Sequence, residues 1–297
     1  MTEFIMLVGL PGSGKSTYAS SLLKEIPNCV YLSSDKIREE LYGDESIQGD
    51  ANKVFNTLHN RVCSALTNNQ SVIYDATNVN RKSRRGILNR ISGFTVNKSA
   101  HIVWVPYEEC VQRDSNRHRT VGEEVIHKFI YRWETPYYDE GFDTIVLVHN
   151  VGSEFDVKEY HEKMITSMDI PHENPHHSLG VLDHCLCAYN MAFAESNDKV
   201  VIEASRLHDI GKPMTKFYAK DDDVNALPHA HYYNHHNVGG YLVLGCFDRK
   251  VSDFAIDVSW LITNHMEPFF NSSYYNKLGG LLKSRIDTLH KFDLNSH

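Results

Sequence analysis

Residues 9–17 read Gly-Leu-Pro-Gly-Ser-Gly-Lys-Ser-Thr, which matches the phosphate-binding P-loop pattern G-x-x-x-x-G-K-[ST] at every fixed position. The apolar run 4–8 before this stretch predicts a buried strand, and residues 18–24 after it predict a helix. Glycines allow successive backbone N–H groups to turn inward around a phosphate, and the start of the helix adds a partial positive charge. We therefore expect a nucleotide site in which Lys15 reaches the β- and γ-phosphates and the Ser16 hydroxyl holds Mg²⁺. The other residues of this predicted site are Gly9, Pro11, Gly12, Ser13, Gly14 and Thr17.

The composition restricts the class of protein. The chain has 297 residues, 41% of them hydrophobic, which is enough for two domains with real cores. Its net charge of −8 argues against a protein whose whole surface is basic for binding duplex DNA. A local basic surface that binds one strand end is compatible with this net charge. The six cysteines show no C-x-x-C pair, the first three residues lack the basic start of a signal peptide, and no apolar run reaches membrane-spanning length. We expect reduced thiols in a cytoplasmic protein that does not act at a membrane.

Strand-like and helix-like segments alternate through the first half of the chain. Strands are predicted at 4–8, 30–35, 71–75, 101–105 and 144–148, with helices at 18–24, 35–41, 52–66, from 81 and at 107–119. This alternation is typical of an α/β domain with a parallel sheet and flanking helices. Ligands of such sheets gather at the carboxyl ends of the strands. Lys15, Asp35 and Asp75 all fall at that edge.

Transfer of a phosphoryl group to a hydroxyl needs a carboxylate that takes the proton and a cation that stabilises the moving phosphoryl group. Asp35 is the best candidate for the base, because it follows a strand that ends near the P-loop; a helix N-cap is the equally weighted structural alternative. Arg38 lies three residues further on and shares its face. Arg113 and Arg117 are four apart in a predicted helix and are the best candidates for a lid over the phosphates, with a solvated charged face as the alternative.

These residues occur in an order that resembles the P-loop polynucleotide 5′-kinases, in particular the phage-type RNA-repair kinases. The motifs that carry the resemblance are the P-loop, Ser-Ser-Asp-Lys-Ile-Arg at 33–38, Asp-Ala-Thr-Asn at 75–78, the arginine-rich stretch 113–119 and Glu-Gly-Phe-Asp at 140–143. The resemblance covers residues 1 to about 150. It implies transfer of the γ-phosphate of ATP, or of another nucleoside triphosphate, to a 5′-OH end. Kinases of small molecules share parts of these motifs.

The same resemblance implies roles for single residues. Asp35 would be the general base, and Arg117 would stabilise the transferring phosphate with Arg113 near the donor. The residues implied to bind the acceptor are Arg38 and Thr77, which would meet the phosphate next to the acceptor nucleoside, Asp75, which would fix Arg38, and Asn78.

The character of the sequence changes near residue 152. We expect a P-loop kinase domain at 1–152, a connector at 153–175 and a second domain at 176–297. The second half shows helical spacing throughout and no strand alternation after residue 176, with helices predicted at 179–191, 200–209, 238–246, 254–265 and 278–290. The second domain is therefore predicted to be all-α.

A vicinal pair, His208-Asp209, ends one of these predicted helices. Its imidazole nitrogen and carboxylate oxygen can bind one divalent ion, and such ligands suit Mn²⁺, Fe²⁺, Ni²⁺, Co²⁺ or Mg²⁺. Thiol ligands are not expected, because no cysteine stands at a ligand-like position. Further histidine motifs occur around 183–184, 233–240, 264–265 and 290–293.

This order of motifs resembles the HD superfamily of metal-dependent phosphohydrolases across residues 176–297. The resemblance implies that one metal is bound by His184, His208, Asp209 and Asp293. It implies that His235 and His265 bind either a second metal or the phosphate, and that Lys212 lies near a substrate phosphate. Asp287 stays open as an alternative to Asp293, and His235-His236 departs from the His-Glu of many relatives. The histidines at 176, 177, 229, 231 and 236 are assigned to the surface or core.

The two halves together predict a bifunctional enzyme that heals the ends of broken RNA. It would phosphorylate 5′-OH ends and remove 2′,3′-cyclic or 3′-phosphates, so that an RNA ligase can act afterwards; DNA ends stay open as substrates. The alternative is a nucleoside or nucleotide kinase joined to an HD nucleotidase. A third reading makes the helical half a degenerate nucleotide sensor, which the complete His184, His208 and Asp209 set disfavours.

Overall fold

The computed structural model describes residues 2–117, 119–173, 178–218 and 229–296. The chain divides into unit 1, made of Met1–His127 and Pro136–Val151, and unit 2, made of Lys128–Thr135 and Gly152–His297. Lys128–Thr135 was expected in the first domain, whereas this segment packs within unit 2. Residues 174–177, where the expected connector meets the expected second domain, lie outside the described residues.

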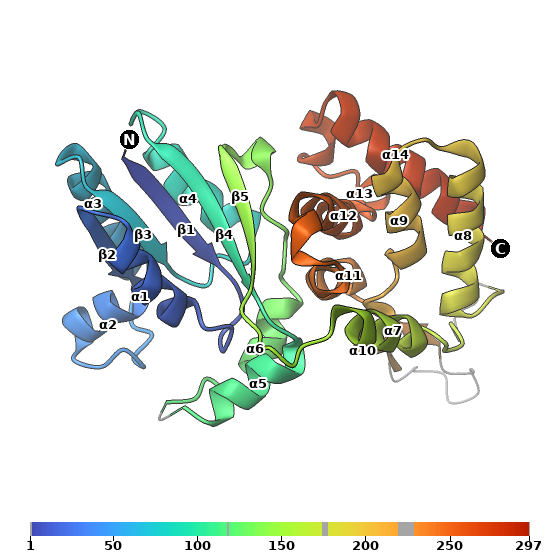
Figure 1. Cartoon of the computed structure of the whole chain (residues 1–297), viewed down its shortest axis with the longest axis horizontal. Helices are drawn as coiled ribbons and strands as arrows, with labels where there is room; N and C mark the ends of the chain where they lie inside the picture. Colours follow the sequence, from blue (N-terminus) through green and yellow to red (C-terminus); the bar gives the residue numbers. More distant parts are fainter. Residues whose placement is uncertain (1, 118, 174–177, 219–228, 297) are drawn as a thin grey trace. The chain divides into compact units, whose positions relative to one another are not determined.

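Five parallel strands form the sheet of unit 1 in the order β2-β3-β1-β4-β5 (Figure 1). The register pairs Asp75 with both Leu7 and Ser33, so the carboxyl ends of three strands meet at one edge. The predicted parallel α/β sheet is therefore confirmed. The strands are β1 (Glu3–Val8), β2 (Cys29–Ser33), β3 (Ser71–Asp75), β4 (Asn97–Trp104) and β5 (Thr144–His149).

Helices connect and flank these strands. They are α1 (Lys15–Glu25), α2 (Ser34–Tyr42), α3 (Ala51–Thr67), α4 (Arg81–Arg90), α5 (Tyr107–Ser115) and the 3₁₀ helix η1 (Tyr138–Glu140), while α6 (Glu123–Ile130) leads into unit 2.

Two predicted boundaries are wrong for local reasons. The predicted strand 30–35 stops at Ser33, because its hydroxyl accepts a hydrogen bond from the Asp35 N–H at 3.2 Å and caps α2. The helix predicted at 107–119 stops at Ser115. Beyond it, the Asp114 carboxylate accepts hydrogen bonds from the N–H groups of Val121 and Gly122 at 2.9 and 3.0 Å, which folds the chain back over the helix end.

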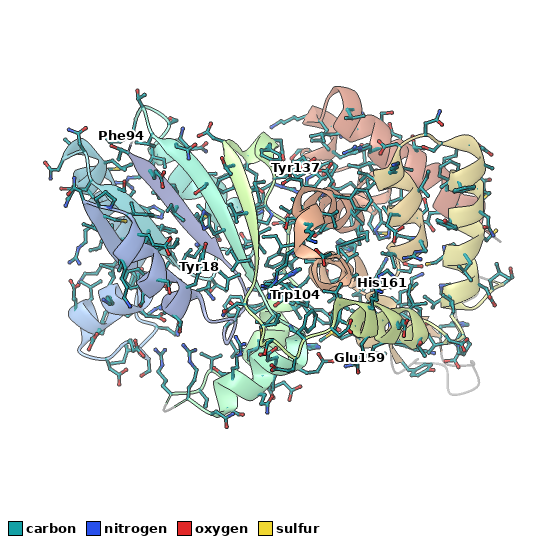
Figure 2. All side chains as sticks on the ribbon, viewed as in Figure 1. Tyr18, Phe94, Trp104, Tyr137, Glu159 and His161 are labelled. Atoms are coloured by element: carbon teal, nitrogen blue, oxygen red, sulfur yellow. The ribbon has the colours of Figure 1, made fainter. Side chains whose placement is uncertain are left out.

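The core of unit 1 is built on β1. Its residues from Phe4 to Val8 are at most 2% exposed. Ala19 of α1 packs against Ile5 on one side of the strand. Tyr18, labelled in Figure 2, shares a hydrogen bond of 2.8 Å with Nδ1 of His101 in β4. Burial of this apolar strand holds the P-loop at a fixed place on the sheet edge.

Unit 2 is helical, as predicted. Its helices are α7 (Val157–Ser167), α8 (Val181–Glu195), α9 (Lys199–Leu207), α10 (Lys212–Thr215), α11 (His235–Val243), α12 (Ser252–Asn264), α13 (Glu267–Phe270) and α14 (Gly280–Leu294), with 3₁₀ helices η2 (Leu244–Cys246), η3 (Arg249–Val251) and η4 (Tyr275–Lys277). The expectation of an all-α domain is wrong in one place, because β6 (Phe217–Tyr218) and β7 (Ala230–His231) form a small antiparallel pair. Across the described residues, no helix is both long and apolar enough to cross a membrane.

The segment Lys128–Thr135 is part of the core of unit 2. The ring of Trp133 packs edge-on against Tyr241 of α11, with centroids 5.0 Å apart. The Thr135 hydroxyl lies 2.6 Å from the Ser259 hydroxyl and 3.0 Å from that of Thr263, both in α12. Apart from Thr263, which is 4% exposed, all of these residues are fully buried, so the segment fills interior space.

Candidate active sites

The P-loop has the backbone that its glycines predict. Gly12 and Gly14 have φ values of 81° and 86°, in the left-handed region that favours glycine. A β-carbon at Gly12 would lie 2.2 Å from the carbonyl oxygen of Cys110, and one at Gly14 would lie 2.2 Å from Nδ2 of Asn150. The loop therefore packs tightly against Cys110 and Asn150, and its position relative to α1 depends on glycine at both positions.

Lys15 folds back over this loop. Its ammonium donates hydrogen bonds to the carbonyl oxygens of Gly9 and Leu10 at 3.0 and 2.9 Å. Burial lowers the pKa of Lys15, the carboxylate of Asp75 opposes that effect, and Arg117 and Asp35 are close enough to contribute in opposite directions. The side chains expected at the sheet edge thus gather within electrostatic reach of one ammonium.

Asp75 lies beside the P-loop serine. Its Oδ2 accepts hydrogen bonds from the Ser16 hydroxyl at 3.1 Å and from the Tyr31 hydroxyl at 2.5 Å. Burial, followed by the charge of Asp75, raises the pKa of Tyr31, so the phenol stays a donor. The resemblance implied that Asp75 fixes Arg38, whereas the described contacts join Asp75 to Ser16 and Tyr31. Tyr31 was not predicted as a site residue, and its only signal was its place in a predicted strand, four residues before the end of that strand.

Asp35 and Arg38 form an ion pair on α2. The Asp35 side chain is 53% exposed and that of Arg38 15% exposed. Because Ser33 is the N-cap of α2, the capping role considered for Asp35 is filled by another residue. The carboxylate of Asp35 is therefore accessible to a substrate hydroxyl.

The two lid arginines have different partners. Arg113 donates to Glu109 at 2.5 Å and to the carbonyl oxygen of Asn150 at 2.8 Å. Arg117 lies beyond the end of α5, where its guanidinium is 3.9 Å from Asp114 and its side chain is 52% exposed. The shared helical face expected from their spacing is wrong, since only Arg113 is in the helix.

The loop after β3 carries the residues expected to bind the acceptor, and hydrogen bonds join this loop to β1 and the P-loop. Asn78 has a φ of 51°, and its amide donates to the carbonyl oxygen of Leu7 at 2.8 Å. The carbonyl oxygen of Thr77 accepts from the Gly9 N–H at 3.4 Å. Arg84 donates to the Asn78 carbonyl oxygen at 3.0 Å from a fully buried ion pair with Glu140.

Unit 2 brings all six predicted metal ligands together. Ligand atoms of His184, His208 and Asp293 lie within 4.8 Å of one another, as do those of Asp209, His235 and His265. A β-carbon at Gly211 would lie 2.1 Å from the carbonyl oxygen of His235, so the missing side chain lets the chain after Asp209 pack directly on the start of α11.

The hydrogen bonds of the four imidazoles determine their tautomers. Each Nδ1 lies 2.7 to 3.0 Å from a backbone carbonyl oxygen, which can only accept, so each Nδ1 carries the proton. In the neutral ring, Nε2 then presents a lone pair. The Nε2 atoms of His184 and His208 face each other at 3.2 Å, and so do those of His235 and His265. Two facing lone pairs repel, so each pair needs a proton on one Nε2 or a cation beside both, and orientation of a ligating histidine by its other nitrogen is typical of metal sites.

The carboxylates complete this arrangement. Oδ1 of Asp293 lies 2.9 Å from Nε2 of His184 and 3.4 Å from that of His208. Asp209 points one oxygen toward each pair, with Oδ2 3.4 Å from Nε2 of His208 and Oδ1 3.3 Å from Nε2 of His235. Asp209 thus joins the two pairs of histidines.

The buried groups of the cluster shift one another's pKa values. Although burial lowers it, the pKa of His208 is raised well above its ordinary value by the neighbouring Cys185, Asp209 and Asp293. Burial of Asp293 opposes its ionisation, but the facing imidazoles of His184 and His208 hold its pKa below the ordinary range. Burial lowers the pKa of His265 to about 4, so this ring keeps a free Nε2 at neutral pH.

Lys212 and His172 lie at one side of the cluster. The ammonium of Lys212 is 2.7 Å from Oδ2 of Asp209 and 3.0 Å from Nε2 of His172. Nδ1 of His172 lies 2.7 Å from the carbonyl oxygen of Leu179, so its Nε2 accepts from Lys212. His172 was not predicted as a site residue, because it stands in no motif and reaches the site only through the fold.

Two other residues settle open points. Asp287 is exposed and accepts a hydrogen bond from Tyr275, so it lies outside the cluster that contains Asp293. Sγ of Cys185 lies 3.7 Å from Nδ1 of His208, on the ring edge that faces away from the other imidazoles. The expectation that no cysteine stands at a ligand-like position is wrong, since ligand atoms of Cys185, His208 and Asp209 lie within 4.8 Å of one another.

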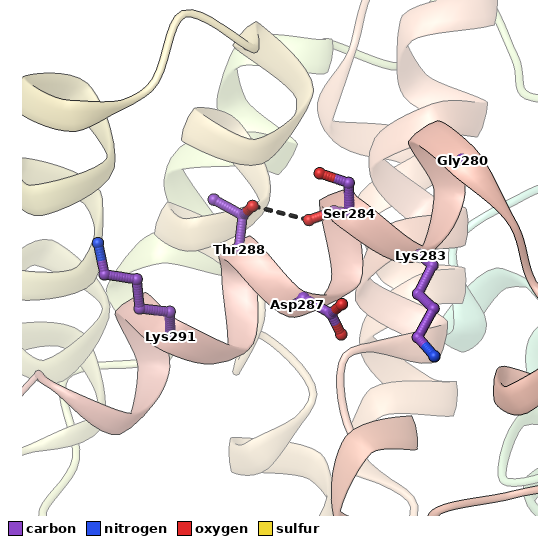
Figure 3. Close-up of a pocket in the computed structure, with 6 residues that line it drawn as sticks. All are labelled: Gly280, Lys283, Ser284, Asp287, Thr288 and Lys291. Carbon is purple, nitrogen blue, oxygen red and sulfur yellow. Dashed lines mark hydrogen bonds between the residues drawn. The ribbon is translucent and has the colours of Figure 1, made fainter.

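A hollow of about 400 Å³ lies along the outer face of α14 (Figure 3). Its cations already have partners, since Lys283 lies over the ring of Tyr275 and Lys291 is 2.6 Å from Glu195. Asp293 is on a different face of the helix. The residues that line this hollow are Gly280, Lys283, Ser284, Asp287, Thr288 and Lys291.

Comparison with known proteins concerns mainly the P-loop half. Residues 4–136 match a family model described as an AAA domain. An L-seryl-tRNA(Sec) kinase of Methanococcus maripaludis is 29% identical over 137 residues, which are 44% of this chain and 52% of that protein. The chain thus spans about half the length of this curated relative. These matches identify a kinase-like P-loop domain in unit 1.

Two solved structures are also similar. A chain of the Pnkp1/Rnl/Hen1 RNA repair complex is 25% identical with a TM-score of 0.41, over 44% of this chain and 43% of that one. A fungal RNA kinase is 19% identical with a TM-score of 0.38, over 57% of this chain and 85% of that one.

Proposed function

We propose that unit 1 transfers the γ-phosphate of ATP or a related nucleoside triphosphate to the 5′-OH end of a polynucleotide. The P-loop, the accessible carboxylate of Asp35 and the adjacent Arg38 support a phosphotransferase with a hydroxyl acceptor. The curated relative is named as a kinase of a tRNA-borne acceptor, which supports an acceptor carried on RNA. Free nucleosides are the competing acceptors, because kinases of small molecules share these motifs.

The chain's own residues perform separate steps of this transfer. Lys15 would leave the carbonyl oxygens of the loop for the phosphates of the donor, and Asp35 would accept the proton of the acceptor hydroxyl. Arg38 would hold the phosphate beside that hydroxyl, and Arg117 would stabilise the transferring phosphoryl group. Hydroxyl and carboxylate oxygens such as those of Ser16 and Asp75 suit Mg²⁺, which offsets phosphate charge when bound.

We also propose that unit 2 is a divalent-metal phosphoesterase that removes 2′,3′-cyclic or 3′-phosphates. One observation supports this proposal. In each of two histidine pairs the Nε2 atoms face each other at 3.2 Å, and Asp209 directs one carboxylate oxygen toward each pair. His184, His208, Asp209 and Asp293 would hold the first ion, and His235 and His265 would hold a second ion or the phosphate. Nitrogen and oxygen ligands favour Mn²⁺, Ni²⁺, Co²⁺ or Fe²⁺, which supply Lewis acidity toward a phosphate oxygen.

The two activities suit one substrate. Cleavage that leaves a 5′-OH end and a 2′,3′-cyclic or 3′-phosphate end yields RNA that a ligase cannot join. A kinase and a phosphoesterase in one chain repair both ends, and the class of reaction that consumes the products is ligation.

The kinase is tested with γ-labelled ATP and a 5′-OH oligonucleotide, compared with a panel of free nucleosides. Label transfer to the oligonucleotide, abolished by Lys15→Ala, supports the proposal. Because Lys15 is the cation of the loop, we expect a loss of about a hundredfold or more. Transfer to nucleosides alone would instead establish the small-molecule alternative.

The phosphoesterase is tested by elemental analysis of protein purified without chelator, followed by phosphate release with added Mn²⁺, Ni²⁺, Co²⁺ or Mg²⁺. Asp293→Asn should lose both metal and activity. Asp287→Asn is a matched control on the same helix, since Asp287 is exposed and outside the cluster. Metal content unchanged in a His208→Ala/Asp209→Ala variant would move the site elsewhere. Bound metal without hydrolysis of any terminal phosphate would leave a nucleotidase or sensor.

A further inference from the structure

Solvent reaches the metal cluster at two of its ligands. The side chain of Asp293 is 12% exposed and that of His235 is 9% exposed. His184, His208 and Asp209 are at most 1% exposed. The cluster is therefore open to solvent at Asp293 and His235.

The short helix α13 carries two exposed phenylalanines beside those ligands. Phe269 is 53% exposed and packs edge-on against His290, with ring centroids 4.5 Å apart. His290 lies one turn before Asp293 on α14. Phe270 is 59% exposed, and its ring centroid lies 5.9 Å from that of His236, the neighbour of His235.

The backbone of α13 is capped at its end, which orders the turn that carries both phenylalanines. Asn271 has a φ of 45°, and its N–H donates to the carbonyl oxygen of Glu267 at 2.9 Å. Glu267 also accepts a hydrogen bond from the Ser272 hydroxyl. Two adjacent large apolar side chains that stay exposed on an ordered turn are typical of a binding surface.

We propose that Phe269 and Phe270 form a stacking platform for the last bases of a single strand whose 3′ end enters the metal cluster. This inference rests on the proposed phosphoesterase function and narrows its substrate to base-bearing polynucleotide ends. Every base has a flat π-face, so aromatic stacking binds strands without regard to sequence. Stacking also suits a chain with a net charge of −8, which offers the phosphate backbone little attraction overall.

The test uses two oligonucleotides that carry a 5′-phosphate, so that the kinase has no free hydroxyl, and a 3′-phosphate. They are identical except that one lacks its last two bases. Phosphate release gives kcat/KM with metal present, and fluorescence anisotropy in EDTA gives the affinity without turnover. Both are measured on the full chain.

Phe269→Ala and Phe270→Ala should each lower kcat/KM and affinity for the complete strand by roughly tenfold, the effect of losing one stacked base. The strand without its last bases should be bound equally by wild type and variants. Phe270→Tyr keeps the π-face and should keep the affinity. Phe193→Ala is the matched control, because Phe193 is 69% exposed but lies on α8.

Each other outcome has one meaning. Equal binding of the two strands by wild type, or an equal loss on both strands in the variants, overturns the platform. Nucleoside 3′-monophosphates hydrolysed as efficiently as the strand overturn the restriction to polynucleotides. If no phosphate is released but the base-dependent affinity is present, the platform stands and the proposed phosphoesterase fails. If both strands are hydrolysed alike in every variant, the phosphoesterase stands and the platform fails.

Discussion

Breaking the buried ion pair of unit 1 should destabilise it far more than breaking an exposed pair of the same chemistry. Arg84 donates to Glu140 through Nε at 2.8 Å and through a terminal nitrogen at 2.6 Å, and both side chains are 0% exposed. Glu140→Gln leaves the guanidinium buried without a countercharge, which costs about 3–5 kcal/mol in the free energy of unfolding. Arg61 and Glu40 make a similar bidentate pair with side chains 44% and 50% exposed, so Glu40→Gln should cost about 0–1 kcal/mol.

A double variant separates the charge from the hydrogen bonds. Arg84→Met/Glu140→Leu removes both charges, but it leaves the carbonyl oxygen of Asn78 and the N–H of Tyr137 without these partners. We expect a loss of about 1–3 kcal/mol, less than that of Glu140→Gln alone.

Hydrogen exchange of the β1 and β4 amides measures this free energy for unit 1 without interference from unit 2. A Glu140→Gln protein that loses no more stability than Glu40→Gln would refute the reasoning, because burial would then add nothing to the pair. A double variant less stable than the single one would show that the hydrogen bonds, and not the charge, determine the effect.

Four other substitutions test the two sites. Asp35→Asn should slow phosphorylation of a 5′-OH oligonucleotide by about a hundredfold or more, the usual size of a lost general base, with ATP affinity unchanged in equilibrium binding. Arg38→Ala should raise the KM of the oligonucleotide more than that of ATP in steady-state kinetics, because Arg38 lies beside Asp35. Asp209→Ala should abolish phosphate release and leave label transfer largely intact, since the ligand clusters belong to unit 2 alone. His172→Ala should raise the KM for a 3′-phosphorylated strand about tenfold by freeing Lys212, and His172→Gln should restore part of it.

The contradicting results differ in meaning. Full activity in Asp35→Asn removes it as the base, and an effect of Arg38→Ala on the ATP KM alone places that residue on the donor side. Parallel loss of both activities in Asp209→Ala, with the fold preserved, shows that the sites are coupled. An equal loss in the Ala and Gln variants of His172 shows a packing role.

The sheet of unit 1 was predictable because its strands are short, apolar and regularly interrupted by helices. All five strands were expected within a few residues of their observed places. The end of α5 was not, because it depends on the Asp114 carboxylate, which binds backbone groups seven and eight residues ahead. The β6–β7 pair was also missed, since two residues per strand are too few to show an alternating pattern.

The cluster of proposed metal ligands was predictable as a set of residues but not as a geometry. Its ligands run from His184 to Asp293, and no local spacing joins residues so far apart. The choice between Asp287 and Asp293 illustrates the limit. Six residues along α14 turn the side chain through about 240°, so only one of the two can face the histidines, and the fold decides which. His172 enters the site in the same way, through a segment that precedes α8 and carries no motif.

The path of the chain between the units sets a further limit on sequence reasoning. The strand-like and helix-like halves predict a single division near residue 152, yet Lys128–Thr135 packs within unit 2. A fragment that begins after the predicted division would lack Trp133 and the Thr135 hydroxyl, which lies between Ser259 and Thr263. It would also lose the carbonyl oxygen of Trp133 that accepts from the Asn237 amide at 2.5 Å. Each buried polar group left without its partner costs about 1–3 kcal/mol, and loss of an indole from a core costs about 3–5 kcal/mol. These losses are comparable with the whole stability of a domain, so the activities of the two units are better separated by substitution within the intact chain than by cutting it.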